Sequence, residues 1–160
     1  MQNSRRFALL LIPAAALLAS GPEARGQPNP NEPTALLAAW AAAYSSMDAP
    51  RLAALYTEEA RLWGVTSREQ SVGRAAIQAS FGRPREGVTA VGVTYGAHGV
   101  TRLNESAAVA SGHWIFRMTL ADGSERQAPA RFSITMTRLA DGAWRIADHH
   151  SSFLPTPARP

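Results

Sequence analysis

The chain has 160 residues, of which 46% are hydrophobic and 18% charged, a composition that predicts a globular domain with its own apolar core. It contains no cysteine, and all 16 of its basic residues are arginine, which excludes disulfides, thiolate metal sites, thiol nucleophiles and lysine Schiff-base chemistry. The net charge is +4, but the arginines are scattered without a basic run, so we expect no nucleic-acid partner.

Residues 1–26 have the order of a secretory signal peptide. The basic pair Arg5-Arg6 precedes an apolar run of about 14 residues, and small residues stand at a cleavage site before Gln27. The run is too short for a membrane span, which needs about 20 apolar residues. We therefore expect a periplasmic or secreted protein, with a twin-arginine route left open by the arginine pair. Residues 27–33 form a proline-rich linker.

The segment after the linker has mainly helical patterns. Apolar residues recur at helical spacing from Ala35 to Met47, and Asp48 is placed to cap a short second helix. A third helix is predicted from Gly73 to Phe81, and a short strand from Ala60 to Trp63.

Beyond residue 87 the apolar pattern changes from helical spacing to alternation, which indicates strands. Strands are predicted over residues 88–103, 107–120, 127–139 and from 144 to the prolines at 155 and 157. Glycines within the first of these predict a bulge or bend, and two Asp-Gly pairs predict hairpin turns. Helices followed by an antiparallel meander indicate an α+β fold, in which a curved sheet packs on the N-terminal helices and leaves a cone-shaped cavity.

The last predicted strand carries the most prominent polar residues. Strict alternation places Asp148 and His150 on the face of Trp144 and Ile146, which are expected to point into the core. Asp148 and His150 are then candidate catalytic residues, with a general-base histidine oriented by a carboxylate. Their alternative role is a polar cluster that fixes the strand. The two histidines cannot both serve one pocket unless a bulge intervenes, and His149 is kept as a candidate ligand-binding residue.

Four aromatic residues are candidates to line the cavity, with simple core filling as the alternative: Trp40, Tyr44, Tyr56 and Trp63. A metal site would require histidines from distant strands to converge, because adjacent histidines on one strand diverge. We therefore expect neither a metal nor another cofactor.

Several segments together carry a family resemblance: Trp40 and residues 48–50, 55–60, 107–112, 130–132, 141–144 and 148–155. In these segments the chain resembles the nuclear transport factor 2-like superfamily, which includes SnoaL-like and steroid-isomerase-like proteins. The C-terminal half is also similar to the association domain of calcium/calmodulin-dependent protein kinase II and its bacterial stand-alone relatives. The resemblance implies a cystatin-like cone over residues 34–156, followed by a tail at 157–160.

The resemblance also implies how such a domain works. It implies self-association into a dimer or larger ring through the outer sheet face, and a pocket inside the cone. Arg131 is the candidate carboxylate-binding arginine, although its alternation with Phe132 places it on the assembly face. We expect a non-catalytic domain that binds a small anionic or apolar ligand. The alternative is an acid–base isomerase, cyclase or dehydratase that acts on a carbonyl compound, although no steroid-isomerase arrangement of base and oxyanion tyrosine is recognisable.

Overall fold

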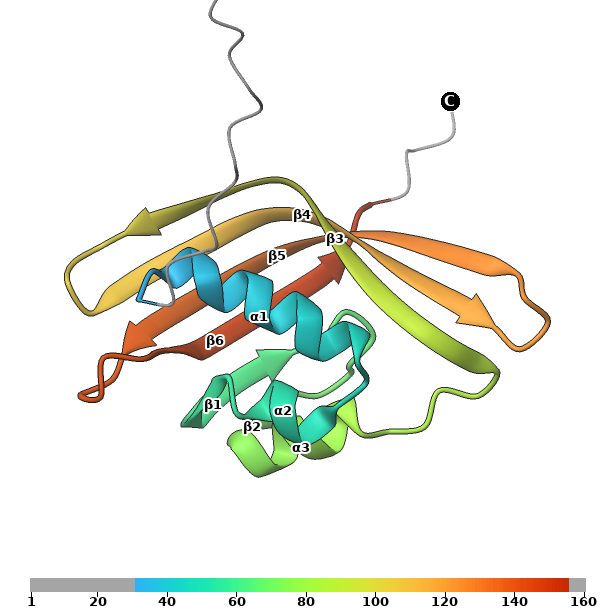
Figure 1. Cartoon of the computed structure of the whole chain (residues 1–160), viewed down its shortest axis with the longest axis horizontal. Coiled ribbons are helices and arrows are strands. Elements are labelled where there is room, and N and C mark those ends of the chain that lie inside the picture. Colours follow the sequence, from blue (N-terminus) through green and yellow to red (C-terminus); the bar gives the residue numbers. More distant parts are fainter. Residues whose placement is uncertain (1–30, 156–160) are drawn as a thin grey trace, which may run out of the picture.

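A computed structural model describes residues 31–155, so the predicted signal segment, most of the linker and the tail lie outside the described residues (Figure 1). The elements follow in the order α1 (Pro33–Ser45), α2 (Ala49–Ala53), β1 (Tyr56–Trp63), β2 (Ser71–Val72), α3 (Arg74–Phe81), β3 (Val88–Arg102), β4 (Ala107–Leu120), β5 (Glu125–Arg138) and β6 (Trp144–Phe153). None of the helices in this part of the chain is long and apolar enough to cross a membrane.

The helices begin where local chemistry favours a start. Pro33 occupies the first turn of α1, where its missing N–H costs no hydrogen bond. The Asp48 carboxylate accepts a hydrogen bond from the backbone N–H of Arg51 at 2.9 Å, which confirms the predicted cap of α2. Gly73 precedes α3 with a φ of 85°, a conformation that glycine adopts without steric cost.

The six strands form one curved sheet in the order β2-β1-β6-β5-β4-β3. Strands β3 to β6 are an antiparallel meander, whereas β1 pairs parallel with β6. Figure 1 shows α1 lying across one face of this sheet, with α2 and α3 near β1 and β2. The predicted α+β fold, with a curved sheet packed on N-terminal helices, is confirmed.

The core lies between α1 and the concave face of the sheet. Trp40 of α1 packs on the inward residues of the strands, which alternate as predicted along β4 and β5 and include Ala110, Trp114, Phe132, Ile134 and Met136. The hydroxyl of Tyr95 on the edge strand β3 donates a hydrogen bond to the backbone carbonyl of Leu37 at 3.0 Å. This bond fixes α1 to that edge of the sheet.

The pairing register shifts at several points in the sheet, and two of these shifts bear on the sequence predictions. The register between β3 and β4 shifts between Tyr95 and His98, as the glycines of β3 predict. On β6, Ile146 pairs with Met136 while Asp148 pairs with the preceding residue Thr135, so that Ala147 is an extra residue.

The bulge on β6 reverses the faces of all residues that follow it. His149 is only 2% exposed and belongs to the core, whereas His150 is exposed. The prediction that Asp148 and His150 point inward with Trp144 is therefore wrong, because strict alternation does not persist through the bulge.

Candidate functional site

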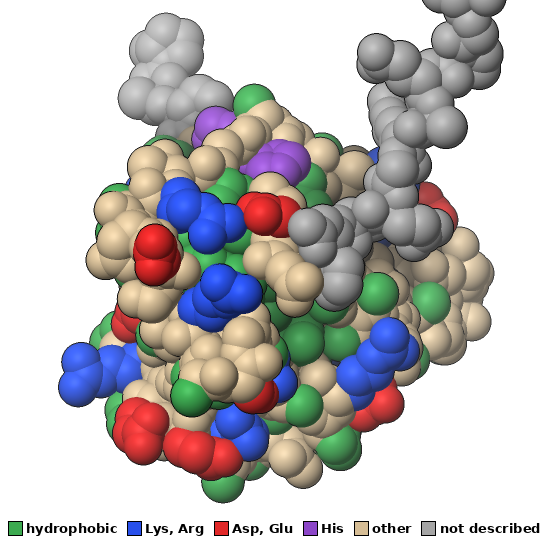
Figure 2. Space-filling model, turned by 60° about the vertical axis from the view of Figure 1, so that its left-hand side comes forward, with side chains coloured by type: hydrophobic (Ala, Val, Ile, Leu, Met, Phe, Trp, Pro, Cys, Tyr) green, Lys and Arg blue, Asp and Glu red, His purple; other side chains and the backbone are tan. Residues whose placement is uncertain are grey.

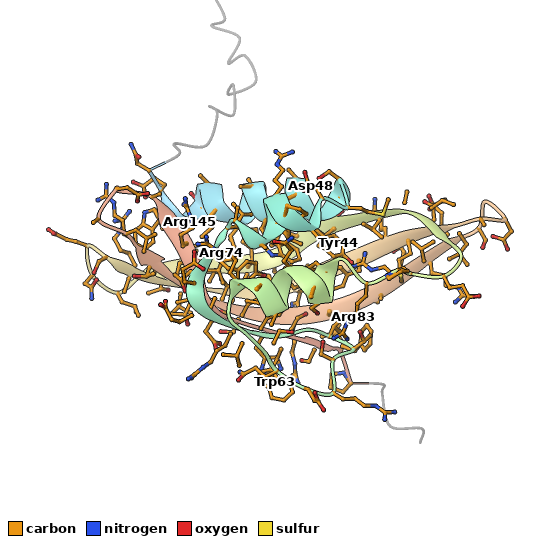
Figure 3. The ribbon with its side chains drawn as sticks, turned by 90° about the horizontal axis from the view of Figure 1, so that it is seen from below. Tyr44, Asp48, Trp63, Arg74, Arg83 and Arg145 are labelled. Carbon is orange, nitrogen blue, oxygen red and sulfur yellow. The ribbon has the colours of Figure 1, made fainter. Side chains whose placement is uncertain are left out.

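A cavity of about 730 Å³ opens between α1, α3 and the concave face of the sheet. Figure 3 shows Tyr44 between α1 and α3, and Arg83 near the end of α3, and both residues line the cavity. Its floor comes from β4 and β6, and its mouth from the segments at residues 64–70 and 83–85. This volume lies within the range that small-molecule sites occupy.

The inner wall is aromatic. Trp40 and Tyr44 are four residues apart on α1 and therefore lie on one helix face, while Trp114 and Phe116 are two apart on β4 and share one sheet face. The Trp40 ring stacks on Tyr44 at 5.2 Å between centroids and on Trp114 at 4.8 Å. Phe81 of α3 closes the wall, with its ring centroid 6.3 Å from that of Trp40.

A chain of hydrogen bonds joins three buried side chains behind this wall. The indole Nε1–H of Trp40 donates to the hydroxyl of Tyr56 at 2.9 Å, and that hydroxyl lies 2.8 Å from Nδ1 of His149. Arg74 donates two hydrogen bonds to the backbone carbonyl of Tyr56, at 2.8 and 3.1 Å, and pairs with Glu58 at 2.6 Å. The first turn of α3 thus fixes the position of Tyr56.

Burial keeps both titratable members of this chain neutral. Loss of hydration on burial, with a smaller contribution from the neighbouring charge of His150, lowers the pKa of His149 from 6.5 to about 3. Burial raises the pKa of Tyr56 above its ordinary value of 10.0. At neutral pH the site therefore contains an uncharged imidazole beside an uncharged phenol.

The second ring nitrogen of His149 has no protein partner. Nε2 is shielded from solvent, and it is the one buried side-chain N or O atom within residues 31–155 that makes no hydrogen bond. A buried polar atom without a partner costs free energy in a folded protein, so such an atom beside a cavity points to a ligand.

The mouth of the cavity is predominantly basic. Arg68, Arg83 and Arg85 line it together with the single acidic side chain of Glu69. The guanidinium carbon of Arg85 lies 5.1 Å from the ring centre of Tyr44, which is within the range of a cation–π contact. Figure 2 shows arginines and acidic side chains interspersed over one face of the molecule.

The structure brings together part of the predicted site. Trp40, Tyr44 and His149 line the cavity, and Tyr56 lies directly behind it. The remaining residues are absent from the cavity wall: Trp63, Arg131, Asp148 and His150.

These remaining residues lie on the outer face of the sheet, which corrects the placement of Trp63, Asp148 and His150 as cavity residues. For Arg131, the outward position is the one that its alternation with Phe132 predicted, and its role as a cavity arginine is not supported. Trp63 pairs with His150 across β1 and β6, and it is 39% exposed on the side of the molecule away from α1 (Figure 3). Arg131 is exposed, and its Nε donates to the hydroxyl of Ser152 at 3.0 Å. The alternation of Arg131 with the buried Phe132 gives the physical reason for its outward position.

Sequence reasoning missed the arginines at the mouth. Arg83 and Arg85 flank Pro84 just after α3, and this segment is otherwise typical of a connecting turn. Two arginines at a helix end beside a predicted cone were the available signal. Among the described residues, no three His, Cys, Asp or Glu side chains lie close enough together to hold a metal ion.

Comparisons with known proteins agree with the fold. A family model described as a SnoaL-like domain matches residues 34–157. The chain is similar to a candidate calcium/calmodulin-dependent protein kinase II association domain from Xanthomonas campestris, with 27% identity, a TM-score of 0.69, and coverage of 92% of this chain and 99% of that one. No curated protein matches the chain at a significant level.

Two further solved structures share the fold at 22% identity. One is a ketosteroid isomerase-like protein from Erwinia carotovora, with a TM-score of 0.65 and coverage of 77% of this chain and 94% of that one. The other is a nuclear transport factor 2-like protein with a cystatin-like fold from Novosphingobium aromaticivorans, with a TM-score of 0.63 and coverage of 77% and 80%. The resemblance indicated by the sequence is thereby confirmed.

Proposed function

This chain belongs to the SnoaL-like domain family within the nuclear transport factor 2-like superfamily, and on that premise we propose that it binds a small ring compound bearing a carboxylate or carbonyl oxygen. The observation that carries the proposal is one cavity of about 730 Å³ with an aromatic inner wall and a basic mouth. Aromatic rings bury flat apolar ligands well, and arginine binds carboxylates through paired hydrogen bonds.

Replacing Arg85 with glutamine is expected to weaken the binding of ring carboxylates about fivefold, because an exposed charge contributes modestly to holding an anion. Titration of the mature chain with benzoate, followed by the fluorescence of the cavity tryptophans Trp40 and Trp114, measures this change. The matched control is Arg126→Gln at the β4–β5 hairpin, which lies outside the cavity wall and should leave the affinity unchanged. Equal losses in both variants would show that the net charge, and not the mouth, attracts the anion.

We also propose that the domain self-associates through the outer face of the sheet. The exposed Trp63 lies beside His150 on that face, and Arg131 lies on it too. The similar protein from Xanthomonas campestris is named for an association domain, which supports this proposal. The outward position of Asp148, His150 and Arg131 favours an assembly role for these residues over a catalytic one.

Light scattering coupled to size-exclusion chromatography is expected to show a dimer or larger species, and Trp63→Arg should shift it toward the monomer because a buried charge without a partner is costly. Leu103→Arg, at a residue that is 60% exposed in the β3–β4 turn, is the matched control and should not change the mass. A strictly monomeric wild-type chain would contradict the assembly proposal.

Export remains a proposal that rests on residues 1–26, whose basic start and apolar run are typical of a signal peptide. N-terminal sequencing of protein from the cell envelope or the medium should begin at Gln27. Retention of residues 1–26 in protein that stays inside the cell would contradict it.

A further inference from the structure

We infer that His149 holds a fixed Nε2–H beside the cavity and selects ligands through an oxygen that accepts this hydrogen bond. The inference deepens the proposed binding function and rests on it. It identifies the ligand class as apolar ring compounds with a carbonyl, enolate or phenolate oxygen at one edge.

The hydrogen-bond donors and acceptors around the Tyr56 hydroxyl fix the direction of its contact with His149. The hydroxyl carries one hydrogen and two lone pairs, and the Trp40 indole can only donate, so Trp40 occupies one lone pair. The contact between the hydroxyl and Nδ1 of His149 is then either a hydrogen bond from Tyr56 to the imidazole or the reverse.

The two arrangements differ in how many buried groups they leave unsatisfied. If Nδ1 carried the proton, the hydroxyl would accept two hydrogen bonds and its own hydrogen would have no acceptor, while Nε2 would hold an unpaired lone pair. If Tyr56 donates to Nδ1, the Nε2–H is the one group in this chain of hydrogen bonds that stays unsatisfied. Each unsatisfied buried group costs about 1–3 kcal/mol, so the second arrangement is favoured. Trp40 therefore sets the tautomer of His149 through Tyr56.

The surroundings of the His149 ring leave the Nε2–H as the donor that a ligand can reach. This ring lies 5.4 Å from both Trp40 and Trp114, between centroids, and its Nδ1 edge is occupied by Tyr56. The Nε2 edge is therefore the one left for a ligand. The atom is shielded from solvent, so an oxygen that reaches it requires a shift of neighbouring side chains.

The geometry also separates two chemical roles. A neutral imidazole that carries its proton on Nε2 can donate to a developing oxyanion but cannot take a proton at that atom. An acid–base enzyme with His149 as general base would need the opposite tautomer. The tautomer therefore distinguishes binding and polarisation of an oxygen from proton abstraction.

The test begins with the tautomer in the ligand-free protein. Replacing His98, His113 and His150 by glutamine changes only exposed histidines and leaves His149 as the single histidine of the chain. A long-range ¹H–¹⁵N correlation spectrum should then show a protonated Nε2 and an unprotonated Nδ1. A protonated Nδ1 would overturn the inference, because Nε2 of His149 could then accept a proton instead of donating one.

The second part uses two uncharged probes of nearly equal shape, acetophenone and cumene, so that the arginines of the mouth favour neither. Acetophenone should bind about tenfold more tightly, because its oxygen satisfies the buried donor. It should also shift the Hε2 resonance. Equal affinities would overturn the inference while leaving the proposed binding function intact. Absence of binding by acetophenone, cumene and benzoate alike would overturn the proposed function and the inference with it.

Discussion

Replacing Tyr56 with phenylalanine is expected to lower the free energy of unfolding by about 3 kcal/mol. The aromatic ring and its packing remain, so the loss comes from the hydroxyl alone. Without it, Nε1 of Trp40 and Nδ1 of His149 are both buried without a partner, because each has Tyr56 as its hydrogen-bond partner. Urea denaturation gives the difference from the shift in midpoint at an unchanged slope.

The matched control is Tyr95→Phe. Tyr95 also donates one hydrogen bond, from a half-buried side chain to the backbone carbonyl of Leu37 at 3.0 Å, but its hydroxyl is hydrogen-bonded to no second side chain. Its loss should cost about 1 kcal/mol. If Tyr56→Phe costs no more than Tyr95→Phe, the three buried side chains do not act as one hydrogen-bonded unit, and Tyr56 does not set the tautomer of His149.

Apolar alternation predicted the sheet well where the strand itself contains no extra residue. On β5, Phe132, Ile134 and Met136 are buried between exposed or half-buried residues, as a strand with one covered face requires. The Asp-Gly turns fixed the hairpins on either side, and Gly123 and Gly142 have the positive φ values, 81° and 82°, that such turns need.

The bulge on β6 could not be predicted from alternation. Ala147, the extra residue, is neither glycine nor proline and gives no local signal. The physical reason for the bulge lies in the tertiary structure. Continued alternation would have buried the Asp148 carboxylate, and burial of a charge without a partner is costly. The bulge leaves Asp148 outside and buries His149 instead, a side chain that can lose its charge and share a hydrogen bond with Tyr56.

The candidate site was predictable only in part for a related reason. The helical spacing of the aromatic residues of α1 predicts that they lie on the inward face of the helix. The resemblance to cone-shaped domains implied a cavity beside that face. The contact between Tyr56 and His149 joins residues 93 positions apart, and their parallel strands β1 and β6 are adjacent only in the folded sheet. No spacing in the sequence encodes that contact.

Acidification from pH 7.5 to 5.0 is expected to lower the free energy of unfolding by roughly 2 kcal/mol through His149 alone. The pKa of His149 is about 3 in the folded chain and takes its ordinary value of 6.5 in the unfolded chain. Above pH 6.5 both states hold a neutral imidazole, and no stability is lost. As the pH falls from 6.5 toward 3, the unfolded chain binds a proton that the folded chain does not, so stability falls. Urea denaturation at each pH measures the slope.

Two neighbouring histidines make the assignment testable. His149→Gln removes the titrating group and should flatten the pH dependence between 7.5 and 5.0, although its stability at pH 7.5 is lower than that of the wild type. His150→Gln replaces an exposed imidazole on the outer face and should keep the wild-type slope. Most carboxylates stay ionised in this window, so their contribution is small and nearly equal in all three proteins. A slope that survives in His149→Gln but disappears in His150→Gln would show that the buried imidazole is not the group that makes the fold sensitive to acid.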